Sequence, residues 1–192
     1  MKRFLSDPWA CLGIGCALAV MLAVAAAQAD STAFAAFLLR WLHLAAGIVW
    51  VGLVVFVNFI QLVALAEADE TARGVLMRMV VPRVAWWFRH AATASLATGA
   101  VLTVTGGYVL PAIVAAAPMR SLLLWSGAAG GIAMWIFVHF LIWPSLQIVL
   151  GHRPSDAETK TRARTRISTF ARLNLILSLP VTFAMVAAAH LH

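Results

Sequence analysis

The chain contains 192 residues, of which 63% are hydrophobic and only 11% are charged, and its formal net charge is +7. This composition is far more apolar than that of soluble globular proteins and predicts an integral membrane protein. The excess of basic residues is explained by membrane topology and anionic lipid headgroups, and nothing in the sequence favours nucleic acid as a partner.

Five apolar segments are long enough to cross a bilayer, which takes about 20 helical residues. They predict helices at about residues 8–29, 33–66, 84–110, 120–150 and 165–190. Only short connections remain between them. Because lipid tolerates no unpaired backbone groups, we expect an all-α fold in which residues 1–192 form a single transmembrane bundle of five helices.

The first apolar segment also has features of a signal peptide. Lys2 and Arg3 precede an apolar stretch that ends in Ala27-Gln28-Ala29, a pattern typical of signal cleavage sites. We expect the segment to be retained as a membrane helix. Its two cysteines, Cys11 and Cys16, do not form the Cys-x-x-Cys-His motif that attaches haem c covalently.

Basic residues predict the orientation, because cytoplasmic loops of membrane proteins carry the excess of Lys and Arg. In the five-helix arrangement, all but two of the 14 basic residues fall on one side, and Arg40 and Arg120 fall on the other. We therefore expect a protein of the bacterial inner membrane with its N-terminus in the cytoplasm and its C-terminus in the periplasm.

Four histidines lie within or at the ends of different apolar segments, namely His43, His90, His139 and His190. Ionisable residues inside a membrane are costly and mark functional sites, and neutral imidazole is a common ligand of iron. With a rise of about 1.5 Å per residue, His43 and His190 fall at one level near the external surface, and His90 and His139 fall in the inner half. We expect haem b between the outer pair, and a second haem between the inner pair.

The neighbours of His43 fit a porphyrin. Gly47 follows His43 on the same helix face and leaves a gap in which a flat macrocycle can lie. Arg40, one turn before His43, can pair with a haem propionate through charge-assisted hydrogen bonds. Arg40 and Gly47 are therefore predicted haem contacts, beside the predicted iron ligands His43, His190, His90 and His139.

A structural role is the alternative for each histidine. An intramembrane histidine can simply hydrogen-bond a neighbouring helix. His139 has Ser95, Thr98 and Asn174 as candidate partners, and His90 can face lipid headgroups.

Other polar residues have simpler explanations. Asn58 and Gln61 are expected to link helices, with a quinone or proton site as the alternative. His152 and His192 are expected to be solvated.

Several short sequence motifs follow one another between about residues 33 and 191. They are Trp41-Leu-His-Leu-Ala-Ala-Gly-Ile-Val-Trp-Val-Gly-Leu53, Pro82-Arg-Val-Ala-Trp-Trp-Phe-Arg89 with Thr98-Gly99, Ile142-Trp-Pro144 with Gly151, and Asn174 followed by Leu-Ser-Leu-Pro180 and Ala-Ala-Ala-His190. The set resembles the urate oxidase N-terminal family, which is the membrane domain of bacterial PuuD-type urate oxidases. The resemblance implies a helical membrane domain of a redox protein, in which His43 and His190 match positions expected to carry histidine.

The resemblance has limits. Members of the family that oxidise urate also carry a cytochrome c domain, and this sequence contains no haem c motif. The resemblance therefore implies a redox domain without implying urate oxidation, and it does not extend to His90 and His139. The pattern Leu-His-x-x-Ala-x-x-x-Trp-x-Gly, which begins at Leu42, is also similar to membrane protoporphyrinogen oxidases and copper-resistance membrane proteins.

The sequence thus predicts a b-type cytochrome that passes electrons through bis-histidine haem towards a periplasmic cytochrome c or a partner redox subunit. Two histidine ligands saturate the iron, which favours electron transfer over oxygen chemistry. One alternative is a haem-dependent membrane oxidase of urate, another small reductant or protoporphyrinogen. Another is a cofactor-free accessory subunit of a respiratory complex. Whether the chain forms a homo-oligomer is left open.

Overall fold

A computed structural model of the chain describes residues 7–27, 31–108 and 118–190. Its elements are all helices, with no strand among these residues, so the predicted all-α class is confirmed. In chain order the elements are α2 (Pro8–Ala27), α3 (Ser31–Phe56), η1 (Val57–Gln61), α4 (Leu62–Glu67), α5 (Glu70–Met79), α6 (Val81–Thr105), α8 (Pro118–Ile136), η2 (Phe137–Ile142), α9 (Trp143–Val149) and α10 (Ala157–His190), where η denotes a π-helix.

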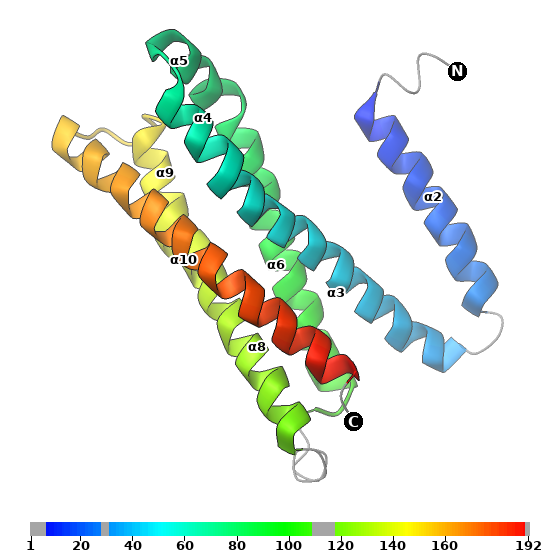
Figure 1. Cartoon of the computed structure of the whole chain (residues 1–192). Coiled ribbons are helices and arrows are strands. Elements are labelled where there is room, and N and C mark those ends of the chain that lie inside the picture. Colours follow the sequence, from blue (N-terminus) through cyan, green and yellow to red (C-terminus); the bar gives the residue numbers. More distant parts are fainter. Residues whose placement is uncertain (1–6, 28–30, 109–117, 191–192) are drawn as a thin grey trace.

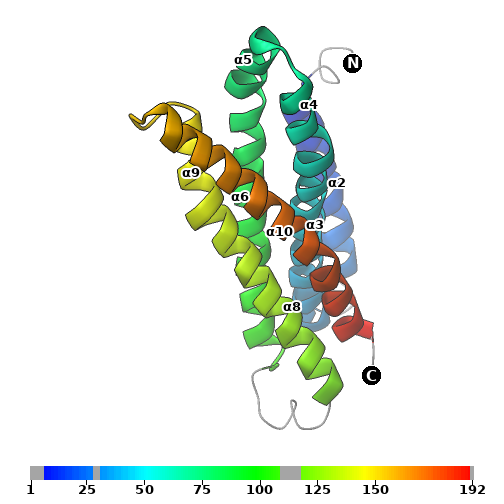
Figure 2. The ribbon, with the colours of Figure 1, turned by 60° about the vertical axis from the view of Figure 1, so that its left-hand side comes forward.

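Four helical rods form the body of the described molecule (Figure 1). The first runs from α3 through η1 to α4, the second is α6, the third runs from α8 through η2 to α9, and the fourth is α10. α6 packs along α3, and α10 packs along α8 and α9, so that successive rods run in opposite directions (Figure 2). The segments predicted at 33–66, 84–110, 120–150 and 165–190 overlap with these rods, but α6 spans Val81–Thr105 and α10 begins earlier, at Ala157. Residues 109 and 110 of the second segment lie outside the described residues.

Several of the helices can cross a bilayer. Within the described ranges, four stretches are both long and apolar enough, namely Pro8–Ala26, Phe34–Glu67, Pro118–Val149 and Ala157–His190. The chain is therefore a multi-pass membrane protein whose apolar helices contact lipid. α6 is less apolar because Arg83, Arg89 and His90 interrupt its apolar residues.

The buried core lies where the four rods meet. Its largest members are Trp50 and Val54 of the first rod, Phe88 of α6, and Met134 and Val138 of the third rod. Partly buried leucines and a valine of α10 close the core from the remaining side. In a bilayer, packing of this kind must supply the association energy, because lipid is as apolar as the side chains.

Small residues let α8 approach α10 closely. A Cβ atom built on Gly127 would lie 3.3 Å from the Cβ of Ala184 and 3.2 Å from the Cε of Met185. One built on Gly130 would collide with Val181. Close approach through small residues is the usual basis of helix association in membranes.

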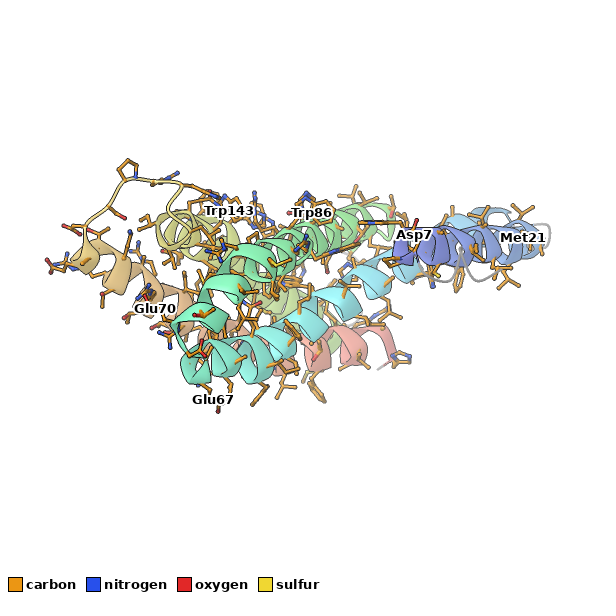
Figure 3. The ribbon with its side chains drawn as sticks, turned by 90° about the horizontal axis from the view of Figure 1, so that it is seen from above. Asp7, Met21, Glu67, Glu70, Trp86 and Trp143 are labelled. Atoms are coloured by element: carbon orange, nitrogen blue, oxygen red, sulfur yellow. The ribbon has the colours of Figure 1, made fainter. Side chains whose placement is uncertain are left out.

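α2 lies apart from the four rods (Figures 1 and 3). None of its membrane-spanning stretch is buried. It contacts α3, and Trp9 near its start stacks on Trp87 of α6 with ring centroids 5.8 Å apart. A helix that is apolar all round is stable only when lipid or another apolar surface surrounds it.

The connection between the first two rods is more ordered than its sequence suggests. The sequence predicts only a short connection between the segments 33–66 and 84–110, and this connection contains the helix α5. Asp69 caps this helix by accepting a hydrogen bond from the backbone N–H of Ala72 at 2.8 Å. Arg73 donates to carbonyls at the end of α4, including that of Leu65 at 3.0 Å. These side-chain bonds satisfy backbone groups that the turn leaves unpaired.

The π-helix η1 has a side-chain cause. The N–H of Leu62 donates to the carbonyl of Val57, five residues back. The amide of Asn58 donates to the carbonyl of Val54 at 2.9 Å, which is the acceptor that the backbone N–H of Asn58 uses in a regular α-helix. The same amide donates to the carbonyl of Ala171 at 3.0 Å and so links the first rod to α10.

The π-helix η2 precedes a proline. The N–H of Trp143 donates to the carbonyl of Val138, again five residues back. Pro144 follows at once, and it has no N–H to donate and a ring that collides with a regular preceding turn. The wider turn accommodates Pro144 without ending the rod.

Asn58 and Asn174 offer a matched test of this packing. Asn58 is 4% exposed and donates two hydrogen bonds, whereas Asn174 is 0% exposed and neither of its amide atoms has a partner among the described residues. We expect Asn58→Leu to lower the free energy of unfolding by about 1 kcal/mol, the scale of hydrogen bonds inside membranes. Asn174→Leu should cost nothing, because it removes unpaired polar atoms. Unfolding in detergent micelles measures the stability of both variants. Equal losses of stability in the two would contradict the hydrogen bonds assigned to Asn58.

Candidate functional site

All four membrane histidines make the same backbone contact. The Nδ1 atom lies 2.9 Å from the carbonyl oxygen of Ser95 in His43, 2.7 Å from that of Trp86 in His90, 3.1 Å from that of Trp135 in His139 and 2.9 Å from that of Val186 in His190. A carbonyl oxygen can only accept, so Nδ1 carries a proton in each ring, and in the neutral ring Nε2 then keeps its lone pair. This is the tautomer in which histidine binds a metal through Nε2, with the other nitrogen held by a second group.

His43 is held between α3 and α6. Its Nδ1 also lies 3.2 Å from the Oγ1 of Thr98, and the ring lies against Gly99, where an added Cβ would be 2.9 Å from Cε1. The α-carbon of Gly47 faces the same helix, because a Cβ there would lie 3.9 Å from the Oγ of Ser95. The gap that we expected beside Gly47 for a porphyrin is therefore turned towards α6.

His190 lies at the exposed end of α10. The end of this helix is held by Arg120, whose Nε donates to the carbonyl of Ala188 at 2.9 Å and whose NH2 group donates to the hydroxyl of Tyr108 at 3.3 Å. The sequence marked Arg120 only as an external base. Arg40 is exposed on α3.

The structure does not join the outer histidine pair directly. His43 faces α6, whereas α10, which carries His190, packs mainly on α8. No hydrogen bond or ring contact links the two residues in the described part of the chain. α3 begins and α10 ends at the same end of the bundle (Figure 1).

The inner pair lies in two matching Trp-x-x-x-His units. The ring of His90 stacks on Trp86 with centroids 4.1 Å apart, and that of His139 stacks on Trp135 with centroids 4.4 Å apart. Thr93 lies between the units: its hydroxyl accepts from Nε1 of Trp135 and donates to Nε2 of His139, both at 3.2 Å.

Both nitrogens of His139 therefore have partners within the protein. His139 thus has the structural role that we gave as the alternative, a hydrogen bond to a neighbouring helix. Its partner is Thr93 and not Ser95, Thr98 or Asn174. By contrast, Nε2 of His43, His90 and His190 has no hydrogen-bond partner among the described residues. Sequence spacing missed Thr93, because a threonine within an apolar helix usually bonds only its own backbone.

The remaining histidines lie outside this group. His152 is exposed after α9 and lies 2.8 Å from the side-chain oxygen of Gln147, as expected for a solvated residue. His192 falls outside the described residues. Within the described ranges, no three His, Cys, Asp or Glu side chains are grouped closely enough to hold a metal ion together.

No protein-family model, curated protein or solved structure matches this chain.

Gly99 tests the position of the His43 ring. We expect Gly99→Ala to lower the free energy of unfolding by about 1–3 kcal/mol, because the new methyl group displaces the ring. Gly52→Ala on α3 is the control, since nothing lies within 4 Å of its added Cβ and alanine favours a helix by up to about 1 kcal/mol. Unfolding in detergent compares the two variants. Equal stability of both would mean that the ring of His43 does not lie on α6.

Proposed function

We propose that this chain is the membrane subunit of a b-type cytochrome, in which one haem b is bound by His43 and His190. The observation that carries the proposal is the fixed tautomer of His43. Its Nδ1–H is bound by a carbonyl oxygen on another helix, so its Nε2 is available as a metal ligand inside the membrane. A histidine that only glued two helices would be expected to use both nitrogens, as His139 does.

His190 supports the proposal in the same way, because the carbonyl of Val186 holds its Nδ1 and leaves Nε2 available. Arg40 is exposed near His43 and can neutralise a propionate. Bound haem would supply one-electron transfer, and two imidazole ligands would leave no iron position for a substrate.

The proposal is limited to one haem. A second haem between His90 and His139 would require the bond between Thr93 and Nε2 of His139 to break. We therefore assign His139 to linking α6 with the third rod.

We further propose that five helices span the bacterial inner membrane, with α6 as the fifth span. The packing of α6 along α3 supports a fifth span despite the polar residues of α6. The basic residues around α5 and the start of α10 favour a cytoplasmic position for that end of the bundle. The haem would then lie near the periplasmic surface, within reach of a cytochrome c or a partner redox subunit. The motifs that resemble the urate oxidase N-terminal family imply the same redox role, and no family-model match supports that resemblance.

The absorption spectrum of the purified protein tests the cofactor. We expect non-covalent haem b with a low-spin spectrum, about one haem per chain by the pyridine haemochrome method. His43→Ala and His190→Ala should each lose the haem or convert it to a high-spin form. His152→Ala is the control and should keep the wild-type spectrum, because His152 lies in a solvated turn.

Three results would count against this assignment. A protein that is purified without haem would favour an accessory subunit, and unchanged spectra in both ligand variants would show that the ligands are wrong. Binding of carbon monoxide by the reduced wild type would reveal an open iron position and favour the oxidase alternative.

Cysteine labelling tests the orientation. With Cys11 and Cys16 replaced by alanine, Pro154→Cys should react with a membrane-impermeant reagent only from the cytoplasmic side. Met119→Cys should react only from the periplasmic side. Both positions are exposed and lie at opposite ends of the third rod. The reverse pattern would overturn the orientation and put the proposed haem on the cytoplasmic side.

A further inference from the structure

A partly open cavity of about 70 Å³ lies within the half of the bundle where α4 and α9 end. It is bordered by all four rods. Most of its lining is apolar, including Phe88 and Trp143, but three polar side chains reach it, those of Asn58, Gln61 and Arg89. Figure 3 shows Trp143 on the same side of the bundle as Trp86 of α6. The predicted function does not use this cavity.

Each polar side chain of the cavity has a buried atom without a hydrogen-bond partner among the described residues. These atoms are Oδ1 of Asn58, Oε1 of Gln61 and Nε of Arg89. The orientation of Asn58 is fixed, because its NH₂ group donates to the carbonyls of Val54 and Ala171. Its Oδ1 is therefore a fixed acceptor. Unpaired buried polar groups cost about 1–3 kcal/mol each, so a ligand that pairs them is favoured.

The cavity also has an unbalanced charge. Arg89 is the only ionisable side chain among the described residues that line it. Its guanidinium lies over the ring of Trp143, 4.0 Å from the centroid, and the ion pair found in the described chain is elsewhere, between Arg162 and Glu158. A cation within a membrane is normally paired with an opposite charge or with water.

Both π-helices border this cavity. Asn58 and Gln61 belong to η1, and Val138 and Ile142 of the lining belong to η2. Single π-turns occur frequently at functional sites, where they redirect side chains. Two of them on separate rods border this cavity, and η1 carries two of its three polar side chains.

We propose that this cavity binds a small oxyanion that retains a hydroxyl group, such as hydrogencarbonate or dihydrogen phosphate, the latter free or as a lipid phosphate monoester. The anionic oxygen accepts from Nε–H of Arg89, and the hydroxyl donates to Oδ1 of Asn58. A second hydroxyl, where present, donates to Oε1 of Gln61. Chloride has no hydroxyl to donate. The volume of about 70 Å³ is smaller than the roughly 150 Å³ of a cavity that holds benzene, which favours a small ion over a quinone ring.

Thermal unfolding of the full chain in detergent tests the proposal. We expect sodium hydrogencarbonate or sodium phosphate to raise the melting temperature in a saturable way, whereas sodium chloride and sodium nitrate at the same ionic strength do not. Short-chain phosphatidic acid forms a further arm. A rise with this lipid alone would identify the headgroup as the source, and a rise with the free ions would identify a soluble anion.

Variants of the lining residues test whether the rise in melting temperature depends on the cavity. Arg89→Gln should weaken binding at least tenfold, and Gln61→Leu should weaken phosphate binding without removing the charge. Arg83→Gln is the control, because Arg83 is exposed, bonds the carbonyl of Met79 and does not line the cavity. A chloride effect equal to that of phosphate, unchanged binding in both cavity variants, or no anion effect in the wild type would overturn the proposal. The last result would mean that the cavity holds only water.

Discussion

The absence of water in the bilayer interior governs this structure, because every polar group there must find its partner within the protein. The four membrane histidines meet this requirement at Nδ1, which donates to backbone carbonyls, three of them on the same helix as the histidine. Only His43 donates to another rod. The same requirement explains why Arg120 bonds the carbonyl of Ala188 at the end of α10, and why the unpaired atoms around Arg89 are conspicuous.

Much of the fold could be predicted because apolar length is a strong signal in membranes. The four rods lie where the apolar segments lie. α5 was missed because charged residues and a glycine interrupt its apolar residues, and its start depends on the cap made by Asp69. The π-turns were missed because hydrophobic spacing cannot reveal a change of pitch caused by one amide or one proline.

The sequence predicts how deep each residue of the candidate site lies in the membrane, but not which neighbouring helix its side chain faces. Counting residues along a helix gives the height of His43, but it cannot tell which neighbouring helix the ring faces. That depends on Gly99 and Thr98, which lie more than 50 positions further along the chain. Likewise, the partner of His139 is a threonine on α6 that no motif singles out. The position of the Arg89 guanidinium over the ring of Trp143 could not be inferred from spacing either.

Each π-turn also has a consequence for how this sequence can change. A turn that closes through five residues accommodates one residue more than an α-helical turn. Deleting one residue from η1 would therefore allow a regular α-helix and would keep the faces of α3 and α4 aligned as they are now. Deleting one residue from a regular turn of α3 would instead rotate the rest of the rod by about 100° and exchange its faces between lipid and protein. Single-residue deletions should therefore be tolerated better within η1 or η2 than in the regular turns on either side of them.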